Sequence, residues 1–289
     1  MTELILQTIV NAVYAASYMS LIAVGLVLIF GVMGVINFAH GELYMAGAYT
    51  VVALYSLFDW PFFVSVAAGL VFVGVLGLVM EYALFRPLRD NPLGGLIASI
   101  GFLLILQTTA VLGFGVRMAF IKPPTQAKIE MFDGVVLTHQ RLFVIVAAVV
   151  LLTALYFFLR KTRFGWAMRA CAQDKEAAAL QGISLNQVSR IAMFIGAALA
   201  GVAGALTAPL VSPTPYMGHS VIVTAFIIII VGGIGQIEGA VAAAILYAFV
   251  HTFVTTFYDG VVADIVGLVL MLLVLVIKPT GLFGAKDRA

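Results

Sequence analysis

Residues 160–190 read RKTRFGWAMRACAQDKEAAALQGISLNQVSR and form the one long charged segment between two apolar stretches of this chain. The flanking stretches, 142–159 and 191–211, are each close to the roughly 20 apolar residues that cross a bilayer as a helix. A hydrophilic, basic segment between two such stretches is typical of a loop that joins membrane helices. We call residues 160–190 the charged island and expect a helical membrane protein around it.

The composition of the whole chain supports this expectation. Of its 289 residues, 63% are hydrophobic and 10% are charged, whereas soluble domains carry about 25% charged residues. The mean hydropathy is +1.16, and a net charge of +2 is too small to indicate a nucleic-acid partner. The single cysteine, Cys171, excludes an intramolecular disulfide. The first residues, MTELILQTIV, lack the basic region of a cleavable signal peptide, so none is expected.

Hydrophobic stretches of membrane-spanning length recur along the chain. Two of them, 42–58 and 220–234, are short, so we expect some half-helices or re-entrant segments. The sequence therefore predicts an all-α fold, a polytopic transmembrane helical bundle with eight or nine membrane segments, some broken or re-entrant. Residues 1–289 form a single transmembrane domain in this prediction. The expected segments are 5–30, 42–58, 61–83, 93–113, 142–159, 191–211, 220–234, 239–258 and 261–278.

Basic residues set the expected orientation. Most of the 15 Lys and Arg residues lie in three segments that share one side if nine segments alternate from an outside N-terminus. Because basic loops face the cytoplasm, we expect that side and the C-terminus to be cytoplasmic. The loop 114–141 would face outward, and Trp60 suits the outer interface. The three basic segments contain Arg86 and Arg89, the charged island, and Lys278, Lys286 and Arg288.

Within the charged island, an acidic residue is followed by small residues and then by glycine. Glu176 precedes Ala177 and Ala178, and Gly182 follows as a helix stop. A helix with alanines on one side can lie close against the surface of another protein. The island is therefore a candidate docking element on the cytoplasmic face.

Polar residues interrupt the first apolar stretch within residues 31–49. Asn37 could cap the helix that follows, and Glu42 would then lie near its first turn, where a carboxylate is favourable. Polar groups at membrane depth usually face a protein interior or a wet cavity. One interpretation is a hinge or gate beside a permeation path, and the other is a helix break wetted at the cytoplasmic interface. A metal site is not expected, because His40 and Glu42 lack further ligands.

Three further patterns have mainly structural interpretations. Residues 196–209, GAALAGVAGALTAP, form a seam of small residues that predicts close helix packing, and Pro209 and the prolines after it are expected to end that helix. Residues 232–239, GGIGQIEG, lack the context of a dinucleotide fingerprint and predict a tight turn or the tip of a re-entrant segment. His251 and Asp264 lie inside spans, where interhelical hydrogen bonds or an outer vestibule would accommodate them.

The chain contains no nucleotide-binding or nucleophile motif. We therefore expect no enzyme activity and no cofactor. If the protein moves a solute uphill, the energy comes from an ion gradient or from a separate subunit.

Long runs of this sequence resemble the branched-chain amino-acid ABC transporter permeases, in particular the LivH-type membrane subunit. The resemblance extends over nearly the whole chain. It implies an all-helical, non-catalytic permease subunit that imports branched-chain or related amino acids. The runs are GLVLIFGVMGVINFAHGELYMAGAY (25–49), ALFRPLR (83–89), RACAQDKEAAALQGI (169–183), FIGAALAGVAGAL (194–206) and AFIIIIVGGIGQIEGA (225–240).

The resemblance also implies partners and site residues. The expected partners are a second, LivM-like permease subunit, two cytoplasmic ATP-binding subunits that hydrolyse ATP, and a periplasmic substrate-binding protein, all at a bacterial inner membrane. The loop 169–183 would couple the ATPases to the pathway. The predicted ATPase-coupling residues are Arg169, Asp174, Glu176, Ala177, Ala178 and Gly182, and the predicted pathway or gate residues are Asn37, His40, Gly41, Glu42 and Tyr44.

Other functions remain open from the sequence. Permeases of the same class handle urea, short amides or aromatic acids and share these motifs. An ion-coupled secondary transporter working alone would need a relay of charges inside the membrane. A structural membrane protein without a pore would leave the glycine-rich interruptions unexplained.

Overall fold

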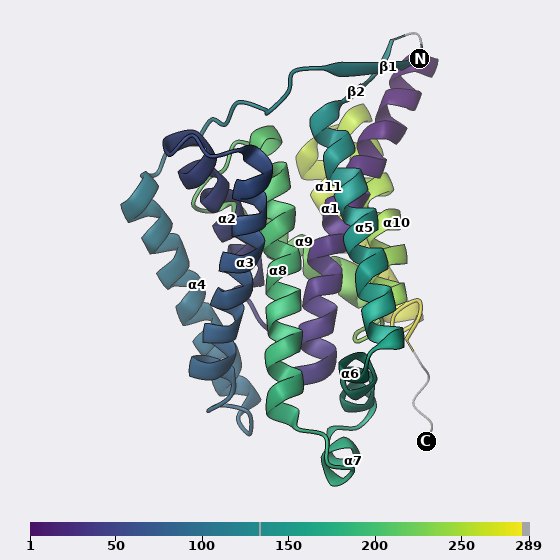
Figure 1. Ribbon diagram of the computed structural model, residues 1–289. Coiled ribbons are helices and arrows are strands. Elements are labelled where there is room, and N and C mark those ends of the chain that lie inside the picture. Colours follow the sequence, from purple (N-terminus) through teal and green to yellow (C-terminus); the bar gives the residue numbers. More distant parts are fainter. Residues whose placement is uncertain (133, 285–289) are drawn as a thin grey trace.

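The computed structural model describes residues 1–132 and 134–284, which form a bundle of long helices (Figure 1). In chain order, the first half contains α1 (Thr2–Met33), α2 (His40–Val51), the π-helix η1 (Val52–Leu57), α3 (Phe62–Met80), the π-helix η2 (Glu81–Phe85) and α4 (Pro92–Phe114). The second half contains β1 (Lys128–Phe132), β2 (Val135–Thr138), α5 (His139–Lys161), α6 (Arg163–Gln173), α7 (Lys175–Leu180), α8 (Leu185–Val211), α9 (Met217–Gly232), α10 (Ile237–Phe257) and α11 (Gly260–Ile277).

Among the described residues, seven helices are long and apolar enough to cross a membrane. The predicted helical membrane bundle is therefore confirmed. Two other apolar segments are short, as expected: α9 has 16 residues, and α2 has 12 residues before η1 continues it. The count of eight or nine membrane segments stays a prediction.

One element was absent from the prediction. The loop 114–141 contains an antiparallel hairpin of β1 and β2, which lies beside the N-terminus in Figure 1. The side chain of Gln7 binds the hairpin twice, because its Nε2 donates to the carbonyl of Val136 at 3.2 Å and its Oε1 accepts from the amide of Val136 at 2.8 Å. The hairpin is thereby attached to the first turns of α1.

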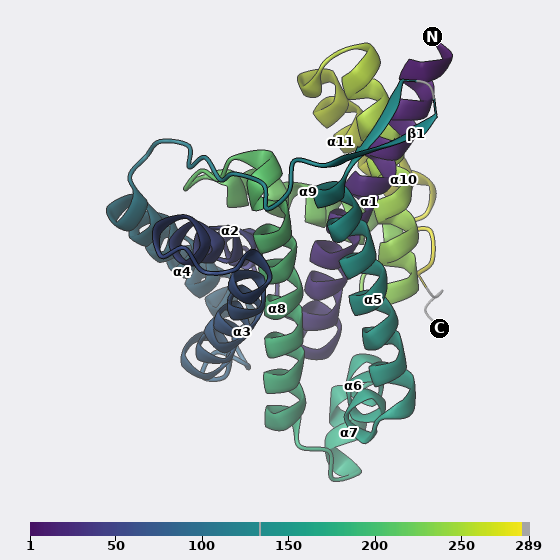
Figure 2. The ribbon, with the colours of Figure 1, turned by 45° about the horizontal axis from the view of Figure 1, so that its top comes forward.

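Helix α8 is the centre of the bundle, with α2, α3 and α4 on one side and α1, α5, α10 and α11 on the other (Figure 2). The predicted small-residue seam makes this possible. A Cβ atom on Gly196 would lie 2.6 Å from the carbonyl oxygen of Gly25 in α1, and one on Gly204 would collide with the carbonyl oxygen of Tyr44 in α2. A Cβ atom on Gly201 would lie 2.6 Å from the side chain of Val73 in α3. The packing interpretation of the seam is confirmed. The prolines mark the end of the helix as expected, since α8 continues only two residues past Pro209 to Val211 and Pro213 follows.

The two ends of the bundle differ in charge. One end, which we call the elbow end, carries the short helices α6 and α7, and the other, which we call the hairpin end, carries β1, β2 and the N-terminus (Figure 1). Burial, and secondarily the charge of Arg89, lower the pKa of Lys175, so the loop that contains Arg89 lies near the charged island. The basic segments share one end as predicted, except that Lys286 and Arg288 lie outside the described residues.

Candidate functional site

The charged island contains two short helices, α6 and α7, which lie at one end of the bundle (Figure 1). We call residues 163–183 the coupling elbow. Thr162 caps α6 by accepting the amide of Gly165 at 3.0 Å, and Asp174 caps α7 by accepting the amides of Glu176 and Ala177, each at 2.9 Å. Gly182 adopts a φ of +80° and ends α7, so the predicted glycine stop is confirmed.

The coupling elbow is attached to the end of the first membrane helix. The Nζ atom of Lys175 donates to the carbonyl oxygen of Met33 at 2.6 Å. Met33 is the last residue of α1, and Gly34 follows it with a φ of +64°. Movement of α7 would therefore act directly on the connection between α1 and α2.

The outer surface of the coupling elbow faces away from the bundle. Glu176, Ala177 and Gly182 are exposed, and Leu180 is 86% exposed. Ala178 is the exception among the predicted residues, because only 4% of it is exposed and it packs inward. An apolar side chain at this tip has no intramolecular burial to stabilise it, which is typical of a contact surface.

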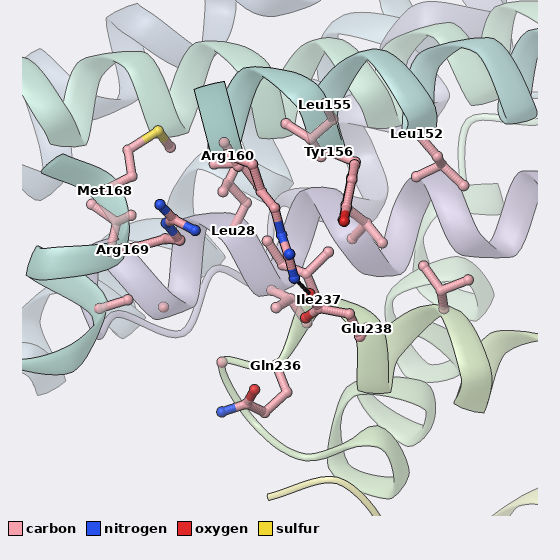
Figure 3. Close-up of a pocket in the computed structure, with 18 of the residues that line it drawn as sticks. Leu28, Leu152, Leu155, Tyr156, Arg160, Met168, Arg169, Gln236, Ile237 and Glu238 are labelled. Carbon is pink, nitrogen blue, oxygen red and sulfur yellow. Dashed lines mark ion pairs between the residues drawn. The ribbon is translucent and has the colours of Figure 1, made fainter. Parts of the chain in front are cut away.

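Arg169 is also exposed, toward a cavity of the bundle. It lines a cavity of 860 Å³ between α1, α5, α6 and α10, together with Arg160 and Glu238 (Figure 3). The Arg160 guanidinium and the Glu238 carboxylate form an ion pair at 3.7 Å, and Arg169 lies over the ring of Trp166 at 5.4 Å. Sequence reasoning missed this cavity, because its polar residues come from segments far apart in the chain.

The residues of the first interruption are buried in the bundle. Asn37, His40 and Glu42 are each 0% exposed, Tyr44 is 2% exposed, and Gly41 is buried as well. The alternative of a helix break wetted at the interface is therefore wrong. The physical reason is that α2 begins inside the bundle, where α8, α9 and α4 surround its first turns.

Each buried polar side chain reaches a different helix or segment. The Nε2 atom of His40 lies 3.0 Å from the carbonyl oxygen of Ile22 in α1. Gln107 of α4 donates to Oε1 of Glu42 at 2.9 Å, and the Tyr44 hydroxyl lies 2.6 Å from that of Thr207 in α8. These residues fasten α2 to three neighbouring helices.

Asn37 plays a different local role from the one expected. The N-cap residue of α2 is Ala39, whose amide donates to Oδ1 of Asn37 at 3.0 Å. Asn37 therefore closes a turn before the helix and does not cap it, because the N-cap residue lies two residues further along the chain. Glu42 does lie in the first turn, as predicted. None of the five predicted gate residues lines the 860 Å³ cavity in the described part of the chain.

Replacing Gln107 by leucine is expected to destabilise the fold by about 1–3 kcal/mol, because a buried carboxyl loses its hydrogen-bond donor. Oε2 of Glu42 already has no partner among the described residues. Thermal unfolding in detergent measures the loss. Thr109→Val on the same helix is the matched control, since that hydroxyl bonds only to Ile105 of its own helix. Equal unfolding temperatures for Gln107→Leu and the wild type would contradict the expectation.

These features define a class: a multi-pass helical membrane protein whose bundle carries a polar helical elbow at one end. Residues 8–275 match the family model described as the branched-chain amino acid transport system permease component, so the chain belongs to this family. The resemblance inferred from the signature runs is confirmed. The protein is thus one component of a transport system with further subunits.

Relatives span nearly the whole chain. The high-affinity branched-chain amino acid transport system permease protein LivH of Escherichia coli K12 is 34% identical over 98% of this chain and 96% of its own. The corresponding protein BraD of Pseudomonas aeruginosa is 32% identical over the same shares. A solved structure of PsaBC from Streptococcus pneumoniae in complex with Fab covers 94% of this chain and 92% of its own, with a TM-score of 0.54 and 12% identity. This last similarity shows a shared fold alone.

Proposed function

We propose that this protein is the permease subunit of an ABC importer and forms, with a second permease subunit, the pathway for branched-chain or related amino acids. The coupling elbow carries this proposal, because it is an exposed helical element with an unburied leucine and a direct attachment to α1. Two partner ATP-binding subunits would hydrolyse ATP, and one of them would bind the elbow of this chain. The chain itself would contribute movement and a pathway, without catalysis.

The contacts of the coupling elbow supply two routes for movement. One route passes from α7 through Lys175 and Met33 to Gly34 and on to α2. The other passes through α6, which carries Arg169 and forms one wall of the 860 Å³ cavity. Docking of an ATPase on the outer surface of the elbow would move both α6 and α7, because packed helices move as units rather than deform continuously.

In this proposal the first interruption acts as the gate element. Asn37, His40, Gly41, Glu42 and Tyr44 do not need to touch the solute to act in this way. Their buried contacts make α2 follow α1, α4 and α8 whenever the connection at Gly34 is moved. Asp174, Glu176, Ala177 and Gly182 would shape the docking surface, Ala178 would support it from inside, and Arg169 would act at the cavity.

The remaining assignments follow from the same proposal. The elbow end would face the cytoplasm of a bacterium and the hairpin end the periplasm, with the N-terminus outside and the chain in the inner membrane as one permease domain. Its basic loops support this orientation. The second permease would be LivM-like, and a periplasmic binding protein would deliver the solute to the hairpin end.

Uptake by the complete transporter in sealed vesicles tests this function. The complex is reconstituted with its binding protein and offered labelled leucine, urea, a short amide and an aromatic acid, with ATP inside. Accumulation of leucine that requires ATP is expected. Selective accumulation of one of the other solutes would contradict the proposed substrate, and accumulation on a proton or sodium gradient without ATP would contradict the proposed mechanism.

A further inference from the structure

A hydrogen-bonded pair connects the last two membrane helices. Nε2 of His251 in α10 lies 3.1 Å from Oδ1 of Asp264 in α11, and the His251 ring stacks on Tyr247 with centroids 5.5 Å apart. The His251 side chain is 25% exposed and that of Asp264 is 71% exposed. No role in the proposed coupling mechanism uses this pair.

The exposure of Asp264 requires a polar neighbour. Carboxylates within membrane helices are costly, and such residues usually face a wet cavity or a polar partner. Asp264 lies about 6 Å from the start of α11, by the helical rise per residue. At this depth interfacial water or a solvated pathway would satisfy the carboxylate, whereas lipid hydrocarbon would not.

The pair lines a cavity of 190 Å³ between α1, α9, α10 and α11. This cavity is smaller than the roughly 300–1,000 Å³ that drug-sized ligands occupy, and it therefore suits a small solute. Its polar lining includes Ser220 and Thr224 beside His251 and Asp264, and its apolar lining includes Met19 and Ile228. Polar and apolar groups thus converge on one space.

We propose that this cavity is a transient binding site for a zwitterionic amino acid with an aliphatic side chain. The His251 contact uses only Oδ1 of Asp264, which leaves Oδ2 able to accept from the ammonium of the solute. Hydroxyls such as that of Thr224 can donate to the carboxylate, and the apolar wall accommodates the aliphatic side chain. His251 is a positioning residue that holds the carboxylate. The inference rests on the proposed function, because it assumes that such amino acids pass through this subunit.

Photolabelling of the complete transporter during ATP-driven uptake tests the site. The probe is photo-leucine, whose diazirine replaces part of the branched side chain, and labelled peptides are identified by mass spectrometry. Label is expected on peptides from α9, α10 and α11. Asp264→Asn should reduce it by about tenfold, the effect of losing one charged hydrogen bond on affinity, and Asp264→Glu should retain most of it.

The matched control is Asp259→Asn on the same helix. Asp259 accepts the amide of Val262 at 2.9 Å as the N-cap of α11, and asparagine caps helices equally well. This control should keep the wild-type label. Label confined to other helices would overturn the site. Label that Asp264→Asn does not reduce would also overturn it, even if this variant has a lower unfolding temperature. Failure of the wild-type complex to accumulate leucine would instead overturn the proposed function, so the two failures are distinguishable.

Discussion

Replacing Leu180 by aspartate is expected to abolish ATP-driven uptake while the subunit still folds and enters the membrane. Leu180 is 86% exposed at the tip of α7, so the change removes no contact within the chain. On the proposed docking surface, however, it would place a charge in an apolar contact. Apolar anchors at the centre of an interface typically contribute 2 kcal/mol or more, so affinity for the ATP-binding subunit should fall by roughly 30-fold or more.

The measurements are co-purification of the ATP-binding subunit and uptake in reconstituted vesicles. Gln187→Asp is the matched control, because Gln187 is also exposed and lies in the first turn of α8, where a negative charge is tolerated. It should retain assembly and uptake. Normal uptake by the Leu180→Asp variant would contradict the proposed role of α7 in coupling.

The largest expected effect on stability comes from adding a single methyl group to Gly47. A Cβ atom there would collide with the backbone carbonyl of Gly201, and its nearest neighbours are all backbone atoms of α8. No side chain can rotate away, so Gly47→Ala should cost about 3 kcal/mol, the upper end of typical overpacking effects, or more. Little folded protein is expected after extraction into detergent.

Gly101→Ala is the matched control for this prediction. Gly101 also lies in a membrane helix, α4, but a Cβ atom there would meet nothing within 4 Å. Alanine favours helix over glycine by about 1 kcal/mol, so this variant should be neutral or slightly stabilised. Gel filtration and thermal unfolding compare the two. Similar unfolding temperatures for both variants would contradict the close packing of α2 against α8.

The membrane helices could be predicted closely from the sequence, because a chain in lipid must satisfy every backbone group within its own helix. The predicted segment 93–113 corresponds to α4 at Pro92–Phe114, and 239–258 corresponds to α10 at Ile237–Phe257. The stop at Gly182 and the small-residue seam were also predictable, because glycine and alanine have the same local consequences in any fold.

Tertiary environment could not be predicted in this way. The sequence places Glu42 in an interrupted stretch but cannot show that Gln107, 65 residues away, donates to it. Tyr44 and Thr207 are separated by 163 residues, and the burial that they share depends on how α2 enters the bundle. The position of Arg169 on a cavity could not be predicted either, because the periodicity of α6 does not reveal which helices its faces contact.

The central claim is that α7 docks on an ATP-binding subunit, and site-specific photocrosslinking tests it most directly. A benzoylphenylalanine residue replaces Leu180 in the assembled transporter, and a second variant carries it at Trp60, which is 46% exposed and lies beside Lys122 of the loop that leads to the hairpin. The account predicts that position 180 crosslinks to the ATP-binding subunit and that position 60 does not. An assembled, active transporter in which position 180 gives no product with that subunit would contradict it.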